Sequence, residues 1–247
     1  MADYQSQYSR AAGAGTMDAS QDAGLRSYML GVYNYMALGV AFTGIITLFL
    51  AANPQLMVTI AVGPAKWVVF AALLGMGFFA PRLIFSGGKA MAHGAYWLYA
   101  ALWGVLISPM VAFFLQSAEG QQDIARAFFI TAATFGAMSL YGYTTKKDLS
   151  GVGRFLMMAA VGLLVVLLIG VFVGFSSTFS LLFSCGVVLV FAGITAYETQ
   201  MIKSMYYQMG SKEEQNRAAI FGAFALYGSF ITLFIHILNI LGIMNNE

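Results

Sequence analysis

One carboxylate lies inside a stretch that is long and apolar enough to cross a membrane. Glu198 is near the end of residues 179–203, and about 20 helical residues are enough to span the hydrocarbon core. A charged group at that depth costs roughly 2.5 kcal/mol or more, so it normally faces a bundle interior or a water-filled cavity and is a functional candidate. Alternatively, Glu198 reaches the nearby interface, because Lys203 follows about one and a half turns later. Both interpretations remain open from the sequence.

Other residue types that could do chemistry are sparse. His93 and His236 are the only histidines, and they fall near opposite faces of the membrane in the spans predicted below, so we expect them not to share a metal or haem. The only cysteine, Cys185, excludes an intrachain disulfide and a cysteine-based metal cluster. Motifs of metalloproteases, serine hydrolases and P-loop nucleotide-binding proteins are missing from the sequence. We therefore expect no cofactor and no enzymatic activity.

The composition identifies the class of protein. Hydrophobic residues make up 60% of the 247 residues, charged residues only 9%, and the mean hydropathy is +0.78. Such a chain has too little polar surface for a soluble globule of this length. The net charge of +2 and the scattered basic residues also argue against nucleic-acid binding. The sequence therefore predicts a polytopic membrane protein whose first partner is the lipid bilayer.

Seven membrane spans are expected, which makes the protein an all-α bundle. They are predicted at residues 27–52, 67–81, 90–118, 127–145, twice within 155–197, and at 218–244. The uncharged run 155–197 suits two helices, and the break is placed near Gly174 because glycine and hydroxyl residues cluster there. Those two spans should be antiparallel neighbours. The short apolar segment after Pro54 is expected to be interfacial or re-entrant.

The distribution of Lys and Arg predicts the orientation of the bundle. Cytoplasmic loops are enriched in these residues. With the N-terminus inside, all twelve except Lys66 and Arg126 fall on the cytoplasmic side. The inner ones are Arg10, Arg26, Arg82, Lys89, Lys146, Lys147, Arg154, Lys203, Lys212 and Arg217. We expect residues 1–25 to form a flexible cytoplasmic tail, because they are small and polar, and residues 26–247 to form the transmembrane domain.

Three segments carry a resemblance to a known family. They are KKDLS at 146–150, AYETQMIK at 196–203 and FALYGSFITLFIHILNILG at 224–242. In this order the chain resembles the Bax inhibitor-1 family of membrane proteins, bacterial branch, over essentially everything from Arg26 onward. The resemblance implies a seven-helix bundle with a cytoplasmic N-terminus in the inner membrane. Its members are described as pH-sensitive calcium leak channels, or as modulators of membrane-embedded proteolysis and cell death.

The resemblance also implies site residues. In the family, an acid in the sixth span and another in the seventh share a proton that opens or closes a pore. The first acid falls on Glu198, but Ser229 stands where the second should be, and Thr232 where the family has Asn. A basic residue at the inner end of the second span, which in the family can pair with the acid, is best matched by Arg82. The loss of one acid puts the pH switch and calcium selectivity in question.

Two functions follow as hypotheses. In the first, the bundle passes calcium, other cations or protons slowly down their gradient, and protonation of Glu198 releases Arg82 and opens a cytoplasmic gate. In the second, the protein transports nothing and binds a membrane protease or another membrane complex, and the N-terminal tail is the feature that favours it. Glu198, Ser229 and Arg82 are the candidate pathway or gate residues.

Overall fold

The computed structural model describes residues 2–245, with side-chain surroundings described from residue 23 onward, and those residues form helices connected by short loops. The helices are α1 (Ala2–Ala51), α2 (Pro54–Met57), the π-helix η1 (Val58–Val62), α3 (Ala65–Ser86), α4 (Lys89–Phe114), α5 (Ala118–Thr144), α6 (Ser150–Val173), α7 (Ser177–Gln208) and α8 (Lys212–Met244). In the described part of the chain, seven helices are long and apolar enough to span a membrane, and the short α2 and η1 are not among them. The predicted all-α, seven-span fold is confirmed.

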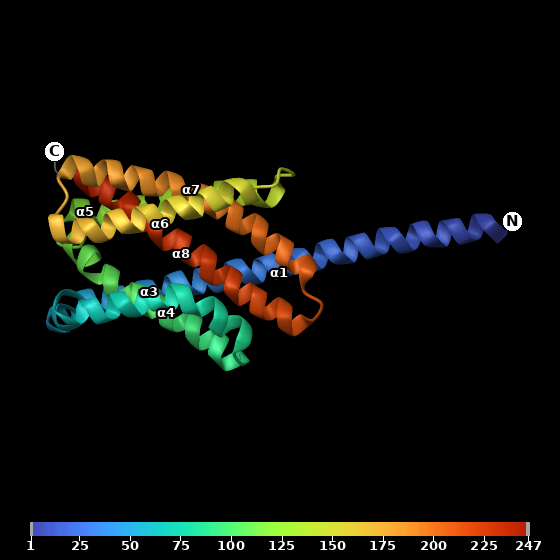
Figure 1. Cartoon of the computed structure of the whole chain (residues 1–247), viewed down its shortest axis with the longest axis horizontal. Helices are drawn as coiled ribbons and strands as arrows, with labels where there is room; N and C mark the ends of the chain where they lie inside the picture. Colours follow the sequence, from blue (N-terminus) through green and yellow to red (C-terminus); the bar gives the residue numbers. More distant parts are fainter. Residues whose placement is uncertain (1, 246–247) are drawn as a thin grey trace.

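Helix α8 lies in the middle of the bundle. In Figure 1 it runs between one group formed by α1, α3 and α4 and another formed by α5, α6 and α7, and it contacts α7, α1, α5, α4 and α3. In the most apolar stretch of 18 residues in α8, 67% of the residues are buried, whereas in the corresponding stretch of α6 the share is 0%. Helix α8 is therefore the core of the bundle, whereas α6 packs on the outside against α7.

The loops gather at the two ends of the bundle. Connections α3–α4, α5–α6 and α7–α8 lie toward the N-terminal end in Figure 1, and the other connections lie toward the C-terminus. We call the first the basic end, because Lys89, Lys146, Lys147 and Lys212 lie at these connections. The charge bias predicts that the basic end faces the cytoplasm.

Several predicted boundaries differ from the observed ones. Helix α5 begins at Ala118 rather than near residue 127, because Ser117 caps it by accepting a hydrogen bond from the Gly120 amide. The segment expected to be interfacial or re-entrant forms α2 and η1. Between α6 and α7, Gly174 has a φ of 79°, a left-handed conformation that favours glycine. This turn supports the expected antiparallel pair.

The predicted tail has a helical backbone. From Ala2, residues of the expected 1–25 segment continue α1 away from the bundle (Figure 1). Six of these residues are alanines, the best helix former, which gives a local reason for the helical backbone. The apolar part of α1 within the described side chains reaches Ala51, and the division at residues 25 and 26 stays a prediction.

Candidate functional site

The site is built around a direct contact between the last two spans. The Ser229 hydroxyl of α8 donates a hydrogen bond of 2.7 Å to Oε2 of Glu198 on α7. Ser229 is buried, and Glu198 is partly buried. The structure thus brings together two of the three residues singled out in the sequence. It places the carboxylate inside the α7–α8 interface, in line with an interior position rather than a purely interfacial one.

The side chains of Lys203 and Arg82 lie elsewhere. Lys203 donates to the Tyr143 carbonyl oxygen at 2.9 Å and sits 4.8 Å from the centre of that ring. Arg82 is exposed, and among the described residues no ion pair joins it to Glu198. The expected Arg82–Glu198 contact is therefore not formed. The buried residues of α3 are Leu73, Ala80 and Ile84. Arg82 is two positions from Ala80 and from Ile84, and because two residues correspond to about 200° around a helix, it lies on the opposite face from both.

A close approach of helices positions the turn that carries Glu198. A Cβ atom added to Gly142 of α5 would clash with the Ala196 carbonyl oxygen of α7, so only glycine fits there. One turn away on α5, Ser139 shares hydrogen bonds with Thr199 of α7 at 2.9 Å and with Tyr33 of α1 at 2.5 Å. These contacts fix the residues on both sides of Glu198 in the sequence.

Tyrosine rings cover the other side of Ser229. Tyr99 of α4 packs against Tyr227 of α8, with ring centres 5.7 Å apart. The Tyr99 hydroxyl also lies close to Gly228, since a Cβ atom added to that glycine would be 3.2 Å from it. The Tyr227 hydroxyl is bonded to Thr43 of α1 at 2.6 Å. Tyr99 of α4 and Thr43 of α1 thus both contact Tyr227, on the α8 turn that carries Ser229, and the Tyr227 hydroxyl has a hydrogen-bond partner.

A row of polar side chains continues from this contact toward the end opposite the basic one. On α8 the residues recur every three or four positions, which places them on one helix face. We call the row the polar stripe; it consists of Ser229, Thr232, His236 and Asn239 on α8, with Glu198, Ser184 and Ser180 facing them on α7.

Hydrogen bonds across the α7–α8 interface define the far half of the stripe. His236 Nδ1 lies 3.1 Å from the Ser184 hydroxyl, and Asn239 donates to Ser184 at 2.9 Å and to Ser180 at 3.1 Å. The sequence reasoning missed these partners, although the spacing of 229, 232, 236 and 239 was a visible signal. Thr232 instead bonds within its own helix, to the Gly228 carbonyl oxygen.

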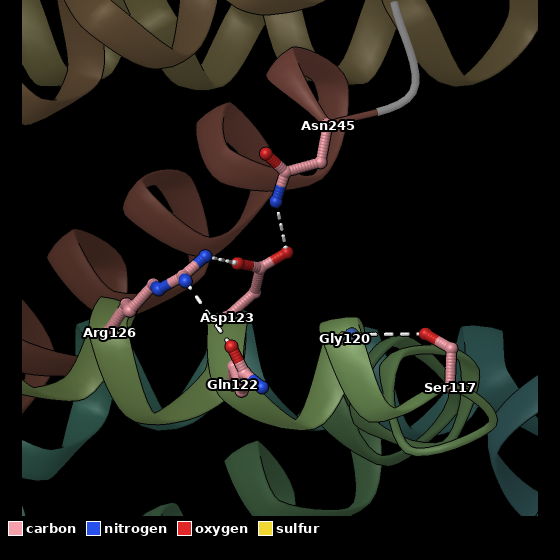
Figure 2. Close-up of polar contacts among 6 residues, drawn as sticks. All are labelled: Ser117, Gly120, Gln122, Asp123, Arg126 and Asn245. Carbon is pink, nitrogen blue, oxygen red and sulfur yellow. Dashed lines mark hydrogen bonds and ion pairs between the residues drawn. The ribbon is translucent and has the colours of Figure 1, made fainter.

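A second carboxylate is buried at the far end of α8. Asp123 of α5 is 3% exposed; its Oδ1 lies 3.1 Å from Arg126, and its Oδ2 accepts a 2.6 Å hydrogen bond from the Asn245 amide at the end of α8. Figure 2 shows the carboxylate held between these two groups. The sequence reasoning overlooked Asp123, because it lies outside the predicted span. The Asp-x-x-Arg spacing at a helix start was the available signal.

The described side chains offer no site for a tightly held metal. Among them, no three His, Cys, Asp or Glu residues are close enough to ligate one ion. The arrangement around Glu198 suits a transient partner, and the reason lies in the chemistry of the carboxylate itself. A lone carboxylate with one hydroxyl donor can take up a proton, or contribute one oxygen to a cation that keeps most of its water.

A bundle of this kind, with seven apolar helices and an acid between its last two, defines a multi-pass membrane protein. The family model described as inhibitor of apoptosis-promoting Bax1 matches residues 25–246. The chain therefore belongs to the Bax inhibitor-1 family.

Relatives from several bacteria resemble nearly the whole chain. A protein of Caulobacter vibrioides is 37% identical over 98% of each chain, and one of Rickettsia prowazekii is 39% identical over 90% of this chain and 91% of its own. The inner membrane protein YbhL of Escherichia coli is 34% identical over 89% of this chain and 93% of its own. Together with the seven apolar helices, these relatives support a multi-pass location in the inner membrane.

Proposed function

We propose that the protein lets small cations, calcium or protons, leak slowly across the inner membrane along the α7–α8 interface. The observation that carries the proposal is the position of Glu198, whose carboxylate lies between the two helices and accepts a hydrogen bond from Ser229. A hydroxyl donor brings no positive charge. The negative charge of the carboxylate is therefore left for a passing cation or a proton to neutralise.

The polar stripe supports a route beyond this acid. Ser184, His236, Asn239 and Ser180 offer oxygen and nitrogen atoms at intervals of about one helical turn toward the far end of the bundle. Polar side chains inside a membrane bundle characteristically mark ion or proton pathways. Tyr99 and Tyr227 close the side toward α1 and α4 with large aromatic rings, so the route would be narrow and the leak slow.

Arg82 enters the proposal only in a second conformation. In the structure its side chain is exposed and is not paired with Glu198. An inward movement of the basic end of α3 would be needed for the two charges to meet. In such a gate, the ion pair between Arg82 and Glu198 would hold the closed state, and protonation of Glu198 would release Arg82.

Flux measurements in liposomes test the leak. Because Arg82 is not paired with Glu198 in the structure, we expect Glu198→Gln, which keeps the shape but cannot ionise, to lower flux about tenfold, the effect of about 1.4 kcal/mol on a barrier. A rise in flux would instead support the Arg82 gate, because the variant imitates the protonated acid. Calcium entry is followed with an entrapped calcium dye, and proton entry with a pH dye under clamped potential. Glu119→Gln is the matched control, because Glu119 is an exposed carboxylate in the first turn of α5. Equal flux in the wild type and Glu198→Gln would remove the proposal.

A second function, binding of a membrane protease or another membrane complex without transport, is favoured by a different observation. The N-terminal part of α1 projects beyond the bundle, where another protein could bind it (Figure 1). Deletion of residues 1–24 should then abolish co-purification of the partner after crosslinking in membranes, while Glu198→Gln leaves it intact. Unaltered co-purification of the truncated chain would exclude this role of the helix.

A further inference from the structure

A cavity at the basic end of the bundle lies apart from the Glu198 contact. It has a volume of about 740 Å³ and lies among α1, α4 and α8. Its polar lining includes Lys89 and His93 of α4, Tyr35 of α1, and Glu213, Asn216 and Arg217 of α8. Small and apolar residues such as Gly31, Ala92 and Ile220 complete it. Neither Glu198 nor any residue of the polar stripe lines this cavity.

The charges of the lining favour an anion. Lys89 and Arg217 are cations, and the single carboxylate, Glu213, is 72% exposed and already bonded to Arg217 at 2.8 Å. The other Arg217 Nη atom donates to the Phe85 carbonyl oxygen of α3 at 2.7 Å. These two contacts hold the guanidinium in place at the cavity wall. Lys89 is exposed at the rim and can turn toward a bound group.

Two further features of the cavity, His93 and the start of α4, can donate hydrogen bonds to a bound group. His93 Nδ1 lies 2.7 Å from the Tyr35 hydroxyl, which leaves Nε2 for another partner. Helix α4 begins beside the cavity with Gly88 as its N-cap and no side-chain cap, so the positive end of its dipole adds to the charge of Lys89. Cations together with a helix N-terminus form a common binding arrangement for phosphate groups.

We infer that this cavity binds a phosphate group, with the headgroup of an anionic phospholipid of the adjacent leaflet as its source. Basic pockets between membrane helices on the cytoplasmic side commonly bind such headgroups, and the charge bias predicts that the basic end faces that side. The apolar part of the lining suits the glycerol and upper acyl region of a lipid better than a fully hydrated ion. A soluble phosphate compound shares the recognising chemistry and is separated by the experiment below.

The experiment compares lipids that differ only in the headgroup. Full-length protein in detergent is titrated with dimyristoyl phosphatidylglycerol or dimyristoyl phosphatidylcholine, and bound lipid is counted by native mass spectrometry. One phosphatidylglycerol should bind at least tenfold more tightly than phosphatidylcholine. Lys89→Gln should weaken phosphatidylglycerol binding about tenfold, the size expected for one charge-assisted hydrogen bond. Lys89→Arg should preserve it.

A matched lysine separates a site from general surface charge. Lys212 is also exposed, at the start of α8, but does not line the cavity, so Lys212→Gln should leave the affinity unchanged. Asn216→Glu adds a negative charge inside the cavity and should weaken binding as Lys89→Gln does. This second variant tests the cavity even if the first one folds poorly.

The remaining outcomes decide between the sources and the alternative. If inorganic phosphate or glycerol 3-phosphate alone binds in a Lys89-dependent way, the site is supported and its ligand is soluble. Equal weakening by Lys89→Gln and Lys212→Gln would overturn the site, because only overall charge would then matter. The absence of any preference for phosphatidylglycerol, together with no binding of the soluble phosphates, would also overturn it.

Discussion

Two carboxylates contact α8 and have very different partners: Glu198 lies beside the middle of the helix, at Ser229, and Asp123 lies beside its C-terminal end, at Asn245. Asp123 is bonded to the Arg126 guanidinium and to the Asn245 amide, so both of its oxygens are occupied and its charge is compensated. Glu198 accepts one hydrogen bond from a hydroxyl, and among the described residues no ion pair includes it. Both carboxylates face α8, but only Asp123 has a cation beside it.

The difference separates structural from functional roles. A buried acid with a cation and an amide has little reason to exchange a proton, and here it fastens the end of α8 to the first turns of α5 (Figure 2). A partly buried acid with only a hydroxyl donor keeps much of the electrostatic cost of its charge, which a proton or a cation would relieve. We therefore assign stability to Asp123 and the proposed leak to Glu198.

The largest effect is expected from a substitution that pushes α5 away from the turn of α7 that carries Glu198. Gly142→Ala forces a Cβ atom against the Ala196 carbonyl oxygen, two residues before Glu198, and backbone cannot give way as a flexible side chain can. We expect a loss of about 3 kcal/mol in the free energy of unfolding, as for severe overpacking. Equilibrium unfolding in mixed micelles measures this loss.

Gly136 supplies the control for that substitution. It lies on the same helix, and a Cβ atom added there meets nothing within 4 Å. Gly136→Ala should therefore be neutral, or stabilising by up to about 1 kcal/mol through helix propensity. A similar loss in both variants would mean that the close α5–α7 approach is not what positions the Glu198 turn.

A smaller effect is expected at Asp123, and it should be asymmetric. Arg126→Gln leaves a nearly buried carboxylate without its cation, whereas Asp123→Asn leaves an arginine that is already 54% exposed. Loss of a buried pair costs 3–5 kcal/mol; with one partner half exposed we expect about 2 kcal/mol for Arg126→Gln and about 1 kcal/mol for Asp123→Asn. Unfolding of the two variants in the same micelles tests the order.

Two further measurements sharpen the assignment of Asp123. Lys66 is the matched cation, since its ammonium group lies 5.4 Å from the centre of the Trp67 ring, and Lys66→Gln should cost below about 1 kcal/mol. Liposome flux should stay at the wild-type level in Asp123→Asn. A flux loss there comparable to that of Glu198→Gln would show that the two carboxylates do not differ in role.

Much of the fold could be predicted from the sequence, because membrane spans need length and low charge, and both are visible in a single chain. The main error, at the start of α5, has the same origin. Glu119, Asp123 and Arg126 made residues 118–126 look like a loop. The charges of Asp123 and Arg126 are instead accommodated within a helix by their i, i+3 pair and by Asn245, the C-cap of α8. The contact between Asp123 and Asn245 joins residues 122 positions apart, so no local sequence pattern indicates it.

The candidate site shows the same limit. Glu198 stood out because charge inside a span is rare, and the family resemblance placed Ser229 in register with it. The predicted contact between Arg82 and Glu198 required the Arg82 side of α3 to face the bundle. Which side of α3 is buried becomes known only from the structure. Nothing in the sequence distinguishes Ser184 from other small residues of α7. Its role becomes visible only in the structure, where it contacts His236 and Asn239 of α8.

The smallest predicted effect concerns a third carboxylate, Asp148, which is exposed in the loop before α6. The Ser150 side chain and backbone amide, the latter at 2.9 Å from Oδ1, lower the pKa of Asp148 below its ordinary value. Because the folded pKa is the lower one, this contact stabilises the fold above the unfolded pKa, near 3.9. The contribution is lost as pH falls through the folded value.

Asp148→Asn should therefore lower the midpoint of thermal unfolding slightly at pH 7, and the gap to the wild type should close below about pH 4. Flux should not change at any pH, since solvent already screens this charge. A gap that stays constant down to pH 3 would mean that the carboxylate charge contributes nothing. A flux effect would mean that an acid needs neither burial nor α8 to act on the leak, and the contrast between Glu198 and Asp123 would lose its physical basis.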